Sequence, residues 1–143
     1  MTRIPVALQL YSIRQHMTED VPGTLAAVAE MGYEGVEFAG FFDYSPEELA
    51  KLCADVGLGI AGAHVQVATI EGEALKATID EHLALGNTYI VVPGLPAAYT
   101  ESVEAWKRTA GVFSAAVEAI EDAGLKLGYH NHKAEFMPLE GEI

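Results

Sequence analysis

The sequence predicts an α/β fold in which parallel strands alternate with helices. Five short, mainly apolar runs have the form of strands that are buried on both faces, and four longer segments with helical periodicity separate them. A glycine ends each helical segment, as is common at helix C-termini. Strands joined through helices form right-handed βαβ units, so we expect a single parallel sheet. The four glycines are Gly32, Gly57, Gly86 and Gly124.

The first half of the chain supplies two strands and two helices. A strand at 6–11 is followed by a helix at 21–31, which has proline in its first turn. A second strand at 35–39 leads to a helix that starts after Ser45 and ends near Gly57. Its start is well marked, because a serine cap, a proline at the first helical position and a glutamate three residues after the cap form a capping box.

The second half repeats the alternation. A third strand lies within 57–64, and a helix at 73–85 follows it. The strand at 88–92 is the clearest of the five, because β-branched and aromatic residues fill it and turn residues bound it on both sides. A long helix at 101–123 and a strand at 125–131 complete the pattern.

Composition limits the classes of function. The 143 residues are 50% hydrophobic, which is enough for one compact domain over 1–143 with a buried core. The 8 basic residues stand against 21 acidic residues, giving a net charge of −13, so we expect no nucleic-acid partner and no anionic membrane surface.

The remaining global signals favour a cytoplasmic protein. The single cysteine, Cys53, cannot form an internal disulfide and falls in an apolar helical pattern, which favours a buried structural thiol. We find no export signal at the N-terminus and no apolar run that is long enough for a membrane span. Two other histidines, His16 in a loop and His82 on a helix face, are expected at the surface.

Polar side chains recur where the predicted strands end. Gln9 and Tyr11 lie towards the end of the first strand, His64 ends the third, and His130 and His132 end the fifth, while Glu37 lies within the second. An open doubly wound sheet would suit the short chain, but we find no glycine-rich phosphate loop after the first strand. Polar residues at successive strand ends are instead typical of the catalytic rim of a (β/α)₈ barrel, although about 250 residues are needed to close one.

The segment 126–136 carries the strongest chemical signal. Alternation along an extended chain puts His130 and His132 on one face, with Glu135 just beyond them. Imidazole titrates near neutral pH and is also a common metal ligand. The spacing therefore suits either proton transfer or metal coordination and does not choose between them.

Four motifs resemble one known family. They are Leu8-Gln-Leu-Tyr-Ser12, Gly32-Tyr-Glu-Gly-Val-Glu-Phe38, Gly62-Ala-His64 and Gly128-Tyr-His-Asn-His-Lys-Ala-Glu-Phe136. In order and spacing they resemble the sugar phosphate isomerase/epimerase family, the xylose isomerase-like barrels. The resemblance implies a (β/α)₈ TIM-barrel fold, here truncated to about the first five β/α units as an open partial barrel.

The same resemblance implies a site. It implies a divalent metal, with Mn²⁺ first and Mg²⁺, Co²⁺ or Zn²⁺ as alternatives, which binds sugar oxygens while an acid/base group moves a proton next to a carbonyl. We assign catalysis to His130 and His132 and the metal-ligand role to Glu135. Substrate contacts are assigned to Gln9, Tyr11, Glu37 and His64. Further metal ligands come from strands six to eight in the family, so we expect this chain alone to be catalytically incomplete.

Three functions remain open. The leading hypothesis is a metal-assisted isomerase or epimerase acting on a small-molecule sugar or sugar phosphate. The first alternative is a dehydratase or lyase that acts on a keto-sugar or keto-inositol through the same enolate. The second is a non-catalytic half-barrel that associates with itself or with a complementing C-terminal half through its open strand edges. The acidic charge disfavours the related endonuclease IV-like branch.

Overall fold

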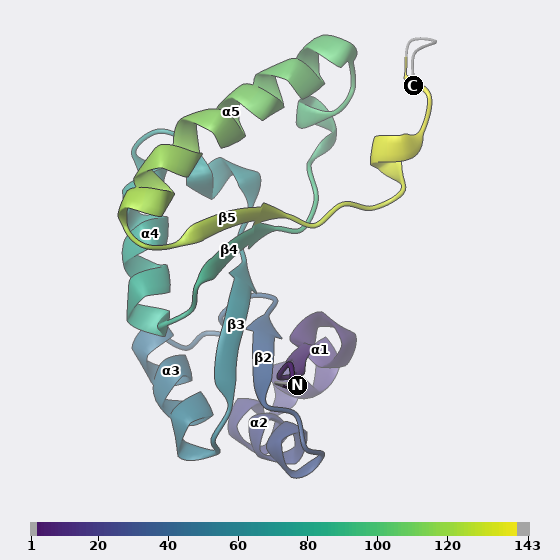
Figure 1. The fold of residues 1–143 in the computed structure, drawn as a ribbon. Helices are drawn as coiled ribbons and strands as arrows, with labels where there is room; N and C mark the ends of the chain where they lie inside the picture. Colours follow the sequence, from purple (N-terminus) through teal and green to yellow (C-terminus); the bar gives the residue numbers. More distant parts are fainter. Residues whose placement is uncertain (1–2, 140–143) are drawn as a thin grey trace.

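The computed structural model describes residues 3–139 and shows a curved parallel sheet (Figure 1). Its strands are β1 (Ala7–Gln9), β2 (Gly35–Phe38), β3 (Gly59–His64), β4 (Tyr89–Val92) and β5 (Lys126–Tyr129). Each strand lies beside the next one in sequence, in the order β1-β2-β3-β4-β5. A doubly wound sheet reverses its strand order, and this sheet does not. The sheet is therefore an arc of a partial TIM barrel, as predicted.

Helices connect successive strands. They are α1 (Arg14–Glu19), α2 (Val21–Glu30), α3 (Pro46–Asp55), α4 (Ala74–Leu85) and α5 (Val103–Asp122). Short 3-10 helices are η1 (Leu10–Ile13), η2 (Val67–Ile70), η3 (Ala97–Tyr99) and η4 (Ala134–Phe136). Figure 1 shows α3, α4 and α5 following one another along one side of the sheet. The crossovers from β2 to β3, from β3 to β4 and from β4 to β5 therefore pass on the same side of the sheet.

The predicted start of α3 is confirmed. The Ser45 hydroxyl accepts a hydrogen bond from the Glu48 amide at 3.2 Å, and the Glu48 carboxylate accepts one from the Ser45 amide at 2.7 Å. Each partner satisfies an amide that the helix itself leaves unpaired, which stabilises a helix by about 1 kcal/mol. This start places the end of β2 and the loop before α3 at the rim.

The first predicted strand, 6–11, is wrong in its extent and its burial. β1 ends at Gln9, because the Gln9 side-chain oxygen accepts a hydrogen bond from the Tyr11 amide at 2.9 Å and begins η1. Tyr11 is consequently outside the strand and 57% exposed. Among residues 3–139, β1 pairs with β2 alone, and it is not buried on both faces. The short helix α1, which follows, was not predicted.

The core has two apolar clusters, one on each half of the sheet. The first includes Leu10, Leu25, Phe38 and Leu49, and the second includes Ile90, Val92, Ala116 and Ile120. Cys53 lies in the first cluster as predicted, and burial raises the pKa of its thiol to about 11. That thiol is therefore inert at neutral pH.

The predicted surface position of His82 is wrong. Its side chain is completely buried, because Thr78, His82 and Leu85 are spaced along α4 so that they share the inward face. The ring Nδ1 is 2.9 Å from the Thr78 carbonyl oxygen, and Nε2 has no hydrogen-bond partner among residues 3–139. His16 is exposed as expected, although it lies in α1 and not in a loop.

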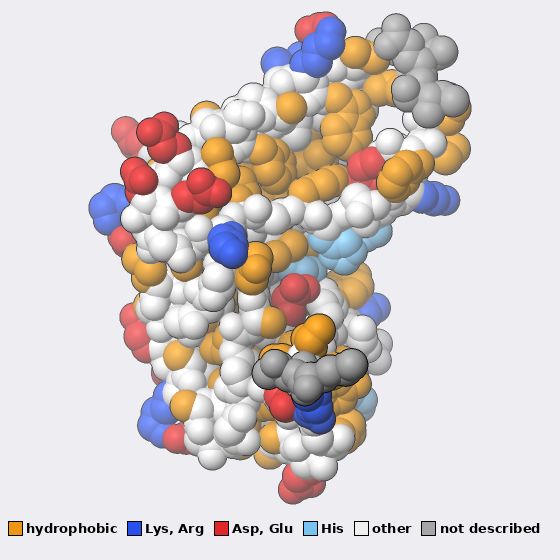
Figure 2. All heavy atoms as spheres, in the orientation of Figure 1, with side chains coloured by type: hydrophobic (Ala, Val, Ile, Leu, Met, Phe, Trp, Pro, Cys, Tyr) orange, Lys and Arg blue, Asp and Glu red, His pale blue; other side chains and the backbone are white. Residues whose placement is uncertain are grey.

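Charged side chains are distributed over the outside of the helices, whereas histidines are visible in the hollow beside the end of β5 (Figure 2). Within the described part of the chain, no helix combines the length and the apolar composition that crossing a bilayer requires.

Candidate active site at the strand ends

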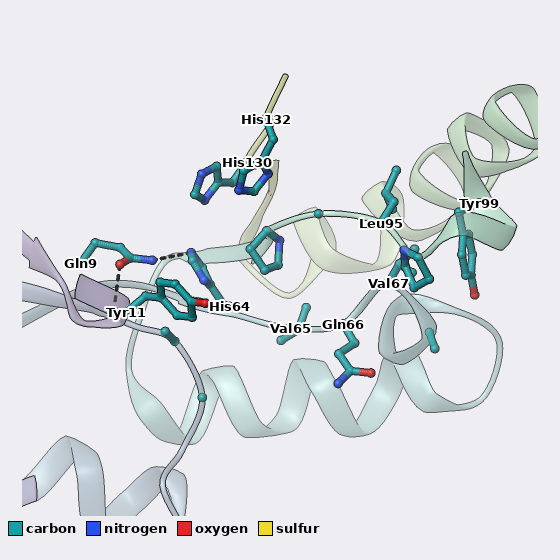
Figure 3. A pocket seen from close by; sticks show the side chains of 16 residues that line it. Gln9, Tyr11, His64, Val65, Gln66, Val67, Leu95, Tyr99, His130 and His132 are labelled. Atoms are coloured by element: carbon teal, nitrogen blue, oxygen red, sulfur yellow. Dashed lines mark hydrogen bonds between the residues drawn. The ribbon is translucent and has the colours of Figure 1, made fainter. Parts of the chain in front are cut away.

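A cavity of about 650 Å³ lies at the C-terminal ends of the strands (Figure 3). Its walls come from the residues that follow β1, β2, β3, β4 and β5, so every strand contributes to one site. Catalytic side chains of barrel enzymes gather at this rim. The polar residues in the lining are Gln9, Tyr11, His64, Gln66, Tyr99, His130 and His132.

Three imidazoles meet at this cavity. His64 is the last residue of β3, and the His130 amide donates a hydrogen bond to the Val92 carbonyl at 2.9 Å, which continues the β4–β5 pairing past the strand. The His64 and His130 rings are 5.7 Å apart, and the His130 and His132 rings stack at 4.7 Å with an interplanar angle of 12°. The predicted convergence of His130 and His132 is therefore confirmed. Both are solvent-exposed, not buried in the core.

His64 is held by a carboxylate from the neighbouring strand. The Glu37 Oε1 atom lies 2.9 Å from His64 Nε2, and the His64 side chain is only 9% exposed. An ionised carboxylate can only accept a hydrogen bond, so His64 Nε2 must carry the proton. A neutral His64 then has an unprotonated Nδ1, for which the described residues offer no hydrogen-bond partner.

The proton on His64 Nε2 also determines which hydrogen bonds the Gln9 side chain can make. The Gln9 amide nitrogen is 3.5 Å from His64 Nε2, while its oxygen is used by the Tyr11 amide. Two donors cannot bond to each other, so this approach is a contact and not a hydrogen bond. The Gln9 amide hydrogens are consequently available to a ligand in the cavity.

The structure separates the predicted site residues into two groups. Five of them, Gln9, Tyr11, His64, His130 and His132, line the cavity together. Glu37 does not line it and lies behind His64 as its hydrogen-bond partner. Glu135 does not line it either.

Glu135 instead forms hydrogen bonds within the segment that follows β5 and with the last residue of β5. Its carboxylate accepts hydrogen bonds from the Tyr129 hydroxyl and from the His132 amide, the latter at 2.9 Å. Burial would raise the pKa of Glu135, but these hydrogen bonds and the His132 charge outweigh it and lower the pKa. Burial and the Glu135 contact raise the pKa of Tyr129. Glu135 faces a second cavity of about 490 Å³ beside α5.

The described residues do not fit a metal ion. A protein metal site needs three or more ligands at coordination distance, and residues 3–139 contain no group of three His, Cys, Asp or Glu that could supply them. The predicted ligand, Glu135, is directed at Tyr129 and His132. No catalytic step is therefore assigned to a metal here.

Two polar lining residues, Gln66 and Tyr99, were missed. Gln66 lies two residues after the end of β3, and Tyr99 lies in the longer loop between β4 and α5, so their position after a strand was the available signal. The Tyr99 hydroxyl donates a hydrogen bond to the Glu71 carboxylate at 2.6 Å, which raises the pKa of Tyr99. This bond links the loop after β4 to the loop after β3.

Solved structures share this architecture. A sugar phosphate isomerase/epimerase from Parabacteroides distasonis ATCC 8503 is 28% identical, with a TM-score of 0.82 over 97% of this chain and 55% of that one. A xylose isomerase-like TIM barrel/4-hydroxyphenylpyruvate dioxygenase fusion protein is 18% identical, with a TM-score of 0.67 over 90% of this chain and 22% of that one. The chain thus spans about half the length of the first of these structures.

An AP endonuclease, family 2, from Brucella melitensis is 16% identical, with a TM-score of 0.66 over 98% of this chain and 60% of that one. At this identity, it and the fusion protein show the fold alone. A search of curated proteins found no match. The family described as Xylose isomerase-like TIM barrel matches residues 25–141, which is more than half of the chain. The resemblance predicted from the motifs is confirmed, and the chain belongs to the xylose isomerase-like TIM barrel family.

Proposed function

We propose that this protein acts as a cytoplasmic sugar or sugar-phosphate isomerase or epimerase, which moves a proton next to a carbonyl group. One observation carries the proposal: the imidazoles of His64, His130 and His132 converge on a single cavity at the strand ends. Isomerisation requires a group that removes a proton from one carbon and returns it elsewhere, and imidazole is suited to both steps near neutral pH.

The roles follow from exposure and partners. His130 and His132 are exposed at the cavity, so either ring can exchange protons with substrate and solvent. His64 is fixed by Glu37 and offers Nδ1, while the Gln9 amide can donate to a developing oxyanion. General acid–base catalysis by such groups contributes about 10²–10⁴-fold.

A divalent cation remains part of the proposal for the complete site only. Mn²⁺, or Mg²⁺, Co²⁺ or Zn²⁺, would neutralise charge on sugar oxygens, but it would need ligands in addition to those of residues 3–139. Calorimetric titration of this chain with Mn²⁺ tests that statement. We expect no tight stoichiometric binding, and a tight 1:1 isotherm would contradict it.

Exchange of substrate hydrogen for deuterium from the solvent tests the function directly. The protein is incubated with aldoses, ketoses and their phosphates in D₂O, and ¹H NMR follows deuterium incorporation next to the carbonyl. The double variant His130→Asn/His132→Asn should lose about 100-fold or more of any exchange. His16→Asn is the matched control, because His16 is exposed on α1 and absent from the cavity lining.

The same spectra separate the alternative enzymes. An isomerase or epimerase gives a product of unchanged mass, whereas a dehydratase or lyase expels water from the β-position. Loss of water, or exchange that survives in the double variant, would contradict the proposed assignment.

Open sheet edges favour a second candidate function, as an assembly module. Within the described chain, β1 pairs only with β2 and β5 pairs only with β4, so each has an unpaired edge. Such edges invite pairing with a second copy or with a complementing half-barrel. Light scattering during gel filtration tests this. We expect a dimer or larger species, and a compact monomer with cooperative unfolding would count against it.

A further inference from the structure

We infer that the cavity selects an uncharged carbonyl sugar over the phosphate ester of the same sugar. This inference rests on the proposed function and narrows its substrate class. The carrying observation is the charge of the walls: among the described residues that line the cavity, none is Lys, Arg, Asp or Glu. Phosphate recognition in proteins relies on charge-assisted hydrogen bonds, most often from arginine or lysine.

The polar and apolar groups that are present match a neutral polyol. The Gln9 amide and the imidazoles offer donors and acceptors without a fixed charge. Apolar side chains between them, including Val65 and Leu95, suit the C–H faces of a sugar. A few placed polar groups in a mostly apolar lining are typical of sites for small molecules, and here those groups carry no fixed charge.

Two cationic side chains, those of Arg14 and Lys133, lie close in sequence to residues that line the cavity, but neither belongs to the lining. The Arg14 guanidinium stacks 4.3 Å over the Tyr11 ring and donates to the Tyr11 carbonyl at 3.0 Å, and Arg14 is not among the described residues that line the cavity. Lys133 follows His132, is exposed, and does not line the cavity.

A negative charge lies directly behind the wall. The Glu37 carboxylate is 2.9 Å from His64 Nε2, and His64 lines the cavity. A phosphate dianion beside His64 would therefore be repelled by Glu37 across a single imidazole, whereas a hydroxyl or carbonyl group would not be. The chain's net charge of −13 adds to this repulsion.

NMR titration of the ¹⁵N-labelled 143-residue chain at pH 8 tests the inference, because an ordinary imidazole is uncharged there. The probes are D-fructose, D-fructose 6-phosphate and inorganic phosphate. We expect fructose to shift the amides of cavity residues saturably, with a Kd at least about tenfold below that of either phosphate. Equal or tighter binding of fructose 6-phosphate, or the absence of shifts with fructose, would overturn the inference.

The origin of the selectivity is tested with Glu37→Gln, which keeps an oxygen acceptor for His64 and removes the charge. The ratio of the two sugar Kd values should fall by about three- to tenfold. Glu118→Gln removes the same charge from the exposed surface of α5 and should leave the ratio unchanged. An unchanged ratio in Glu37→Gln would remove Glu37 from the explanation.

The wild-type measurement needs no variant and stands if Glu37→Gln does not fold. It is also independent of turnover. If deuterium exchange is absent but fructose is selected, the proposed activity fails and this inference holds. If exchange occurs mainly with phosphorylated sugars, the inference fails and the proposed activity holds.

Discussion

His82 and His64 are both largely closed off from solvent, yet their surroundings differ in charge. His82 lies in the core with a carbonyl near Nδ1 and, among residues 3–139, no hydrogen-bond partner for Nε2, whereas His64 lies at the rim with a carboxylate near Nε2. Burial lowers the pKa of His82, against the opposing effects of the Thr78 and Ala63 carbonyls and of Glu81. Position along the fold, and not residue type, therefore separates a structural imidazole from a candidate catalytic one.

The largest expected difference is in stability. His82→Ala should lower the free energy of unfolding by about 2–4 kcal/mol, because it leaves a cavity in a closed core. His64→Ala should cost only about 1 kcal/mol, because the Glu37 carboxylate that it leaves unpaired is 28% exposed and can be hydrated. Urea unfolding followed by circular dichroism measures both changes. Equal losses of unfolding free energy in the two variants would contradict the difference between a core and a rim histidine.

The next effect is in pH dependence. The pKa of His82 is lowered from 6.5 in the folded state, so the unfolded chain takes up a proton at this residue first as pH falls. The stability that this residue contributes is fully present above pH 6.5 and is lost as the pH falls below it, by at most about 1.4 kcal/mol per pH unit. The free energy of unfolding should fall less between pH 7.5 and pH 5.5 in His82→Leu than in the wild type. His16→Asn, which changes an exposed histidine, should retain the wild-type dependence.

The smallest expected effect concerns the rim. Tyr129→Phe removes the hydroxyl that donates to Glu135, and Glu135 in turn accepts from the His132 amide. Because Glu135 is only partly buried and keeps the His132 amide as a donor, we expect a stability loss below about 1 kcal/mol. Hydrogen exchange at the His132 amide should quicken, while exchange at the His82 amide stays unchanged. A general increase in both would show that Tyr129 supports the core and not the rim alone.

The fold was predictable where local rules determine it. The Ser45 cap, the Glu48 partner and the glycines that follow α2, α3, α4 and α5 marked these helices correctly, whereas α1, which has no such glycine, was not predicted. The predictions were wrong where a side chain interrupts the backbone or is buried against expectation. Gln9 ends β1 by bonding to the Tyr11 amide, and no sequence rule marks that turn. His82 was treated as polar, although its spacing from Leu85 placed it on the buried face.

The candidate site was predictable for a geometric reason. Parallel strands bring their C-terminal ends to one rim, so polar residues at those ends converge even when they are distant in sequence. Glu37 was predicted as a substrate contact because it lies within an apolar strand, and Glu135 was predicted as a metal ligand from the family resemblance. Their actual partners, His64 and Tyr129, depend on side-chain direction in three dimensions.

The hydrogen bond between Tyr99 and Glu71 has an evolutionary consequence. It joins the loops after β3 and β4, and Tyr99 also lines the cavity. A change at one position leaves the other without its partner, so selection acts on the pair. Among relatives, a carboxylate at position 71 and a phenol at position 99 should be gained and lost together, and loop insertions should be rarer where both are kept.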